Sequence, residues 1–298
     1  MKHIRIISPS GAIDPQWIDA ASSRLRSWGY RVSEGTFARG RYGRFAGTAA
    51  ERITDLNLAL HDPSVDIVLC SRGGYGLQQL IDEVDLSAMS PANKVLVGFS
   101  DITELLQLFT REHVPSLHGL MCKHIAEKPE SDPLLQLWRQ ALDGQPLHYT
   151  LPAHLLNRQG EACGTLIGGN LSVLYGLQGT AWGLNAIIDS VETMGRKAIL
   201  FIEDIGERHY HIDRMMQNLR LSGVLSRIGG LVIGQFSDCD EDELMKSSIY
   251  ETIYTAAAAY SYPVVVNFPA GHVEENSPLW MGRETIIKVT GTGCELLQ

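Results

Sequence analysis

The chain has 298 residues, of which 44% are hydrophobic and 20% charged, an ordinary composition for one large or two medium-sized globular domains. Its net charge of −9, without a basic cluster interleaved with aromatic residues, argues against nucleic acid as a partner. No apolar run is long enough to cross a bilayer. The five cysteines are scattered and odd in number, which predicts free thiols. The short apolar N-terminal run indicates a first strand rather than a secretory segment, so we expect a cytoplasmic protein.

The first half of the chain alternates strand-like and helix-like runs. This alternation is typical of a parallel sheet covered by helices, because parallel neighbours need long crossover connections. In such sheets, ligands bind at the carboxyl ends of the strands. Three turns fall there: Ser8-Pro-Ser-Gly11, Ser71-Arg-Gly-Gly-Tyr-Gly76 and Gly98-Phe-Ser100. In chain order, the expected elements are a strand at Ile4–Ile7, a helix at Pro15–Trp28, a strand at Asp66–Cys70, a helix at Leu77–Val84, a strand at Val95–Phe99 and a helix at Ile102–Thr110.

Between about residues 143 and 164 the apolar periodicity weakens, which favours a connection between two domains. We therefore predict an N-terminal domain over residues 1–145, a linker over 146–163 and a C-terminal α/β domain over 164–298. The elements expected in the last segment are a strand ending at Glu203, a helix near Asp213–Ser222, a strand at Gly230–Phe236, a helix at Ser247–Tyr260, a strand leading to His272 and a strand at Thr285–Val289.

The turn at Ser100 is the most informative local feature. A serine between a strand and a helix has its hydroxyl lifted clear of the sheet, beside backbone N–H groups that the new helix leaves unpaired. The flanking residues Gly98 and Ile102 keep the first glycine of the G-x-S-x-G motif and lack the second, which departs from the α/β-hydrolase elbow. The alternative is a helix cap, with Glu104 as a shifted capping-box partner.

The glycine-rich segment Arg72–Gly76 follows a predicted strand, and its small residues let backbone N–H groups approach an anion. One use would be a phosphate cradle, although the spacing matches neither G-x-G-x-x-G nor a P-loop. The interpretation we favour is an oxyanion hole, with one donor from Gly73 or Gly74 and the other from the N–H of Asp101. A purely structural turn is the third alternative.

A nucleophilic serine needs a histidine base and an acid that orients it. His272 follows a strand-like run, and Glu203 ends another in an apolar context, where an unpaired charge would be costly. Asp204 could take the role of Glu203 if the strand register differs by one residue. His118 and His124 follow the helix of the nucleophile and could line the site. His209 and His211 superficially resemble metal ligands, but no obvious further ligands are near, so a metal is not expected.

With these motifs assembled, the chain resembles the bacterial serine LD-carboxypeptidases, also called murein tetrapeptide carboxypeptidases, a family that also includes microcin-immunity-type hydrolases. Several motifs in one order are more specific than any one alone. The matching segments are Ser8–Gly11, Arg44–Gly47, Arg52–Asn57, Arg72–Gly76, Gly98–Asp101, Gly164–Leu171, Leu200–Ile205, the region after Asp213 and Gly271-His272.

The resemblance implies a catalytic triad of Ser100, Glu203 and His272, at an active site where an N-terminal α/β domain meets a mixed, β-rich C-terminal domain. It implies hydrolysis of the LD-amide between a diamino acid and the terminal D-alanine of a muropeptide, during cytoplasmic peptidoglycan recycling, without metal or cofactor. Arg72 and Asn170 are candidates for binding the terminal carboxylate, although Arg72 could instead brace its loop.

Two rival functions stay open at this point. One is an immunity-type hydrolase that cleaves a peptide-nucleotide antibiotic, and the other is a non-catalytic nucleotide or sugar-nucleotide binder. The expected partner is a small muropeptide, with neither nucleic acid nor membrane involved, and the sequence leaves the oligomeric state open, a homodimer being one option.

Overall fold

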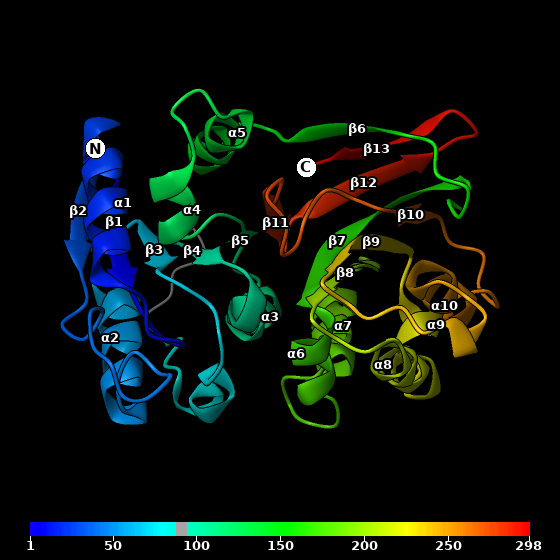
Figure 1. Cartoon of the computed structure of the whole chain (residues 1–298), viewed down its shortest axis with the longest axis horizontal. Helices are drawn as coiled ribbons and strands as arrows, with labels where there is room; N and C mark the ends of the chain where they lie inside the picture. The colour runs from blue at the N-terminus through cyan, green and yellow to red at the C-terminus, as the bar shows by residue number, and fades with distance from the viewer. Residues whose placement is uncertain (88–93) are drawn as a thin grey trace.

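The computed structural model describes residues 1–87 and 94–298. Within these residues, two β-sheets of six and seven strands lie side by side, each with its helices packed around it (Figure 1). The predicted fold class, an α/β N-terminal domain followed by a mixed α/β C-terminal domain, is confirmed. No helix in the described ranges combines the length and the apolar character that a membrane span needs.

The first sheet has the strand order β11-β5-β4-β3-β1-β2. The five strands from the N-terminal half run parallel to one another, so their carboxyl ends meet at one edge, where β4 leads into the Ser100 turn. Its strands are β1 (His3–Ile7), β2 (Arg31–Glu34), β3 (Ile67–Cys70), β4 (Val95–Gly98), β5 (Ser116–His118) and β11 (Leu279–Met281).

Several helices in this half begin with N-terminal capping residues that are recognisable in the sequence. Asp14 and Asp132 cap helices whose first residue is proline, which is pre-organised for that position, and Thr48 with Glu51 forms a capping box. The segment Leu77–Val84, predicted as one helix, instead forms two short 3₁₀ turns, Leu77–Gln79 and Ile81–Glu83. The helices are α1 (Pro15–Ser27), α2 (Ala49–His61), α3 (Thr103–Arg111), α4 (Cys122–Glu127) and α5 (Pro133–Leu142).

The second sheet has the order β10-β9-β8-β7-β12-β13-β6. Strands β7 to β10 are parallel, whereas β12, β13 and β6 join as antiparallel neighbours, so the sheet is mixed. Its strands are β6 (His148–Pro152), β7 (Gly160–Asn170), β8 (Ala198–Ile205), β9 (Gly230–Ser237), β10 (Val264–Val266), β12 (Glu284–Val289) and β13 (Gly293–Leu297). Its helices are α6 (Leu171–Gly176), α7 (Leu184–Thr193), α8 (His209–Leu221), α9 (Val224–Arg227) and α10 (Ile249–Ala256).

The boundary between the two halves differs from the predicted single linker. The segment 146–163, predicted as a linker, contains β6 and the first residues of β7, both paired within the second sheet. Strand β11, from the C-terminal half, instead pairs with β5 of the first sheet. The five residues of β6 and the three of β11 are too few to show a clear strand period, so their places are set by their partner strands.

Helix α3 connects the two halves physically. It packs on β5 of the first sheet and on β7 and α7 of the second, and eight of its nine residues are buried. One cluster of buried apolar side chains continues across the boundary and includes Phe99, Phe201 and Phe268. Because Ser100 begins the short 3₁₀ turn, Ser100–Ile102, that leads into this helix, it is held at the junction of the two halves.

Candidate active site

Ser100 occupies a strained turn directly after β4. Its φ is 68°, a left-handed conformation that costs a non-glycine residue on the order of 1–3 kcal/mol and persists only where the surroundings enforce it. Its hydroxyl makes no helix-capping hydrogen bond, so the cap alternative does not describe this serine. Gly98 is needed for the turn, since a Cβ there would lie 2.9 Å from the Ile102 side chain.

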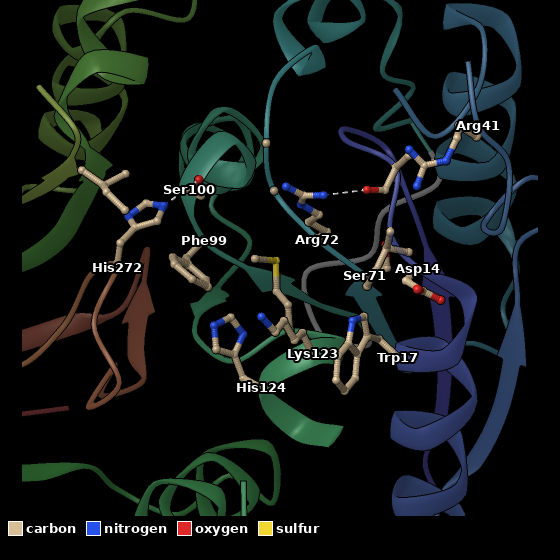
Figure 2. Close-up of a pocket in the computed structure, with 16 residues that line it drawn as sticks. Asp14, Trp17, Arg41, Ser71, Arg72, Phe99, Ser100, Lys123, His124 and His272 are labelled. Carbon is tan, nitrogen blue, oxygen red and sulfur yellow. Dashed lines mark hydrogen bonds between the residues drawn. The ribbon is translucent and has the colours of Figure 1, made fainter. Parts of the chain in front are cut away.

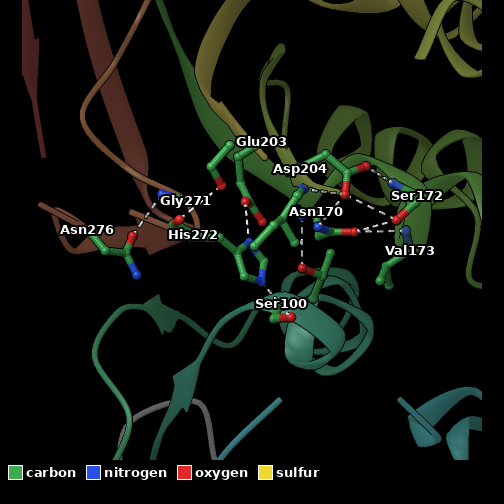
Figure 3. A network of polar contacts seen from close by, with 12 residues as sticks. Ser100, Asn170, Ser172, Val173, Glu203, Asp204, Gly271, His272 and Asn276 are labelled. Carbon is green, nitrogen blue, oxygen red and sulfur yellow. Dashed lines mark hydrogen bonds and ion pairs between the residues drawn. The ribbon is translucent and has the colours of Figure 1, made fainter. Parts of the chain in front are cut away.

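The Ser100 hydroxyl faces His272 instead (Figure 3). The distance from Oγ to Nε2 of His272 is 2.8 Å, and Nδ1 of the same ring lies 2.8 Å from Oε2 of Glu203. A carboxylate only accepts hydrogen bonds, so the ring proton belongs on Nδ1, which leaves Nε2 to accept from the serine. Ser100, His272 and Glu203, all predicted from the sequence, are therefore brought together in a continuous hydrogen-bonded chain.

The surroundings of His272 favour its protonated form. Burial lowers the pKa of the imidazole, but the hydrogen bond to Glu203 and the negative charges of Glu203 and Asp204 raise it further, so that the net pKa lies above the ordinary value. Glu203 itself is fully buried. A buried carboxylate opposite the ring stabilises the imidazolium that forms when the histidine accepts a proton.

Asp204, the alternative acid, points away from the histidine. It accepts hydrogen bonds from the Asn170 amide at 2.9 Å and from the backbone N–H of Ser172 at 2.8 Å, as Figure 3 shows. Burial and the neighbouring charge of Glu203 raise its pKa to about 7. Successive strand residues face opposite sides, which separates the two acids.

Asn170, a predicted carboxylate ligand, is used structurally. Its side-chain oxygen caps α6 by accepting from the N–H of Val173 and from the Ser172 hydroxyl, while its nitrogen donates to Asp204. These contacts occupy both ends of the amide. The structure does not place Asn170 in the cavity that contains the Ser100 and His272 side chains.

The glycine-rich loop lies against the serine. A Cβ on Gly73 would come within 2.8 Å of the Ser100 Cβ and 3.1 Å of its Oγ, so only glycine fits. Neither Gly73 nor Gly74 donates its N–H to another atom within the described part of the chain, and both line the cavity at Ser100. N–H groups without an acceptor beside a serine hydroxyl could stabilise a developing negative charge.

Two buried side chains fix that loop. Arg52 is 2% exposed and donates to the carbonyl groups of Pro9 and Gly76, each at 2.9 Å. The Asp101 carboxylate accepts from the Ser10 hydroxyl and from the N–H of Leu77. The predicted turns at Ser8–Gly11, Arg72–Gly76 and Ser100 therefore meet at one edge of the sheet.

A cavity of about 630 Å³ opens beside Ser100 and His272, and its lining carries several cationic groups (Figure 2). Arg72, predicted from the sequence, lines it and also donates to the Ala12 carbonyl at 2.8 Å, so it both faces the cavity and braces the loop. Trp17, Arg41 and Lys123 also line it. These three were not predicted from the sequence, because they lie on loops and helix ends without a motif.

The remaining histidines have other contacts. His124 lines the same cavity, whereas His118 is fully buried and contacts Asn276 at 3.1 Å. His209 lies 2.8 Å from the Thr252 hydroxyl, and His211 lies 3.0 Å from Glu207. Across residues 1–87 and 94–298, no three His, Cys, Asp or Glu side chains are grouped as metal ligands.

Residues 4–119 match the model of the LD-carboxypeptidase N-terminal domain, and residues 163–287 match that of the LD-carboxypeptidase C-terminal domain. The chain is 33% identical to a murein tetrapeptide carboxypeptidase of Pseudomonas aeruginosa, over 96% of this chain and 92% of the relative. It is 30% identical to a probable murein peptide carboxypeptidase of Bacillus subtilis, over 90% and 83%.

Solved structures agree with this result. A muramoyltetrapeptide carboxypeptidase from Oxalobacter formigenes superposes with a TM-score of 0.87 at 26% identity, covering 99% of this chain and 98% of the other. The microcin C7 self-immunity protein MccF, in complex with glutamyl sulfamoyl guanosine, gives a TM-score of 0.82 at 19% identity, covering 100% and 96%. At that identity, the second match shows a shared fold alone.

Proposed function

The chain belongs to the LD-carboxypeptidase family, and on that basis we propose that it is a serine hydrolase that removes the terminal D-alanine from muropeptide tetrapeptides by cleaving an LD-amide bond. The observation that carries this proposal is the pair of 2.8 Å contacts that link Ser100 to His272 and His272 to Glu203. We assign the three residues to one catalytic triad.

The proposed reaction begins with attack of the Ser100 oxygen on the carbonyl carbon of the diamino acid. Nε2 of His272 takes the serine proton, and the negative charge on the former carbonyl oxygen is stabilised by backbone N–H groups of Gly73 or Gly74 and Asp101. The C–N bond then breaks as His272 gives its proton to the departing D-alanine amine. Water, activated by the same histidine, hydrolyses the ester and regenerates the Ser100 hydroxyl.

The leaving D-alanine has a carboxylate that needs a cationic or backbone donor. We assign Arg72 to this role, because its guanidinium lines the cavity beside the nucleophile. Arg41 and Lys123, on the same cavity, add positive charge. Asn170 is the weaker candidate, since both ends of its amide are already hydrogen-bonded.

We propose that the reaction takes place in the cytoplasm, as part of peptidoglycan recycling, on a small muropeptide and without cofactor or metal. All five cysteines are unpaired, which agrees with a reducing compartment. A homodimer is one form the protein could take in solution, and sedimentation or light scattering would decide.

The test is incubation with purified muropeptide tetrapeptide, followed by mass spectrometry for tripeptide and free D-alanine. We expect release by the wild-type protein and none above background by Ser100→Ala. A parallel reaction with an aminoacyl-nucleotide analogue tests the immunity-type alternative. Cleavage of that analogue alone would replace the muropeptide as substrate, and cleavage of neither would reject hydrolysis.

A further inference from the structure

A second cavity lies on another side of Ser100, and its lining is acidic. It has a volume of about 300 Å³ and shares Gly74, Ser100 and Ile205 with the larger cavity. Asp101, Glu104 and Asp204 contribute to its wall, whereas the described residues that line it include no Lys, Arg or His. The two cavities beside the nucleophile therefore differ in charge.

Glu104 is the unexplained member of this group. It follows the first residue of α3, where acids commonly interact with the helix dipole from an exposed position. Here the residue is only 2% exposed, and Oε2 has no hydrogen-bond partner in the described structure. Leaving a buried carboxyl oxygen without a partner is costly, so the position is well explained by a ligand that supplies the missing donor.

The other two carboxylates are occupied by the protein. Asp101 accepts from Ser10 and Leu77, and Asp204 accepts from Asn170 and Ser172. Glu104 is therefore the carboxyl group of the three that can accept a hydrogen bond from a ligand. Burial, with a further contribution from the charge of Asp101, raises the pKa of Glu104 to about 9, as expected for an acid that lacks a cationic partner. The Glu104 carboxyl is therefore protonated near neutral pH in the free protein, and a bound ammonium would lower its pKa and favour the ionised form.

From this arrangement we infer that the acidic cavity binds the distal ammonium group of the substrate's diamino acid, with Glu104 as its counter-ion. This inference rests on the proposed function. The terminal carboxylate of the leaving D-alanine would be repelled by the acids and attracted by Arg41, Arg72 and Lys123 of the larger cavity, which assigns each charged end of the substrate to its own cavity.

The spacing agrees with this assignment. Glu104 follows Ser100 by four residues, which corresponds to roughly 6–8 Å along a helix or 3₁₀ turn. An ammonium on a four-carbon side chain has a comparable reach from its Cα. The scissile carbonyl at Ser100 and the ammonium at Glu104 can therefore belong to one residue.

The experiment compares two tetrapeptides that differ only in the third residue, lysine or its uncharged analogue norleucine, by the kcat/KM of D-alanine release. We expect the wild-type enzyme to favour lysine by about tenfold or more, the size of a charge-assisted hydrogen bond. Glu104→Gln should remove this preference by slowing the lysine peptide alone. Glu112→Gln is the matched control, since that acid follows the same helix with its side chain 42% exposed, and it should keep the preference.

A second variant guards against misfolding at the buried site. Gln78 is an exposed residue at the edge of the same cavity, and Gln78→Lys should reduce the preference by supplying a competing ammonium. Equal rates for the two peptides in the wild type, or an unchanged preference in folded Glu104→Gln, would overturn the inference while leaving the proposed function intact. No release from either peptide would reject the proposed function and this inference together.

Discussion

Ser100 and His272 are 172 residues apart in the chain, yet Oγ of the first lies 2.8 Å from Nε2 of the second. The serine follows a strand of the first sheet and the histidine follows a strand of the second, so this contact exists only when the two halves are packed together. The larger apolar core cluster, which crosses the boundary, supplies that packing. In this account, stability at the junction and catalytic geometry depend on the same contacts.

The first prediction concerns the triad as a unit. Ser100→Ala, His272→Ala and Glu203→Ala should each reduce kcat for D-alanine release by roughly 10³-fold or more, and double variants should lose little beyond the worse single variant. Circular dichroism should show a retained fold. His211→Ala, which removes a surface histidine, is the control. Losses that multiply in the double variants would mean that the residues act independently.

The second prediction concerns pH. His272 must be neutral to accept the serine proton, so kcat/KM should rise with pH as the imidazole loses its proton. Because Glu203 raises the pKa of His272, Glu203→Gln should lower that pKa and move the acidic limb of the profile to lower pH, while the plateau falls. The measurement is kcat/KM against pH for both proteins.

The control for the pH experiment is Glu207→Gln, which alters another His–Glu pair, with His211 at 3.0 Å. This variant should leave the profile unchanged. An acidic limb that stays in place or moves upward in Glu203→Gln would show that His272 is not the titrating base.

The third prediction uses the close approach of Gly73. In Gly73→Ala the new methyl group would overlap the Ser100 side chain, and small displacements of a nucleophile can cost about 10²-fold in rate. We expect a loss of kcat of that order, with unfolding free energy reduced by about 1–3 kcal/mol, as for overpacked sites. Gly291→Ala, at a turn where the nearest atom is a side-chain nitrogen at 3.6 Å, should change neither value. A fully active Gly73→Ala would contradict the proposed geometry.

The fourth prediction concerns Asn276, which is fully buried. Its Oδ1 accepts from the N–H of Gly271 at 2.9 Å and lies 3.1 Å from Nε2 of His118, so it fixes the residue before His272. Asn276→Ala leaves both partners unpaired and should cost about 1–3 kcal/mol of unfolding free energy. It should lower kcat with little change in KM. Asn185→Ala is the control, at a half-buried asparagine whose Nδ2 donates to the Ser222 carbonyl away from the site, and it should leave kcat unchanged. Normal kcat in Asn276→Ala would exclude a positioning role.

Much of this site can be predicted from the sequence because its parts have strong local signatures. Ser100 follows an apolar run and precedes a helix, and Gly73 lies in a glycine-rich turn after a strand. Glu203 and His272 each follow a run of apolar residues. The carboxyl ends of parallel strands meet at one edge, which is why separate motifs could be assigned to one site.

Other features depend on tertiary contacts that a local pattern does not contain. Whether Glu203 or Asp204 contacts His272 depends on which side of β8 each side chain faces. The pairing of β11 with β5 involves a strand of only three residues. Glu104 resembles a helix-start acid in sequence, and only its burial shows that it is different. Arg41 and Lys123 line the cavity through loop and helix positions that carry no signature.

Labelling with a serine-directed phosphonate, followed by peptide mapping, tests the central claim most directly. We predict a single covalent adduct on the peptide that contains Ser100, formed by the wild-type protein and absent from Ser100→Ala. An adduct on another residue, or labelling that persists in Ser100→Ala, would contradict the assignment of Ser100 as the nucleophile.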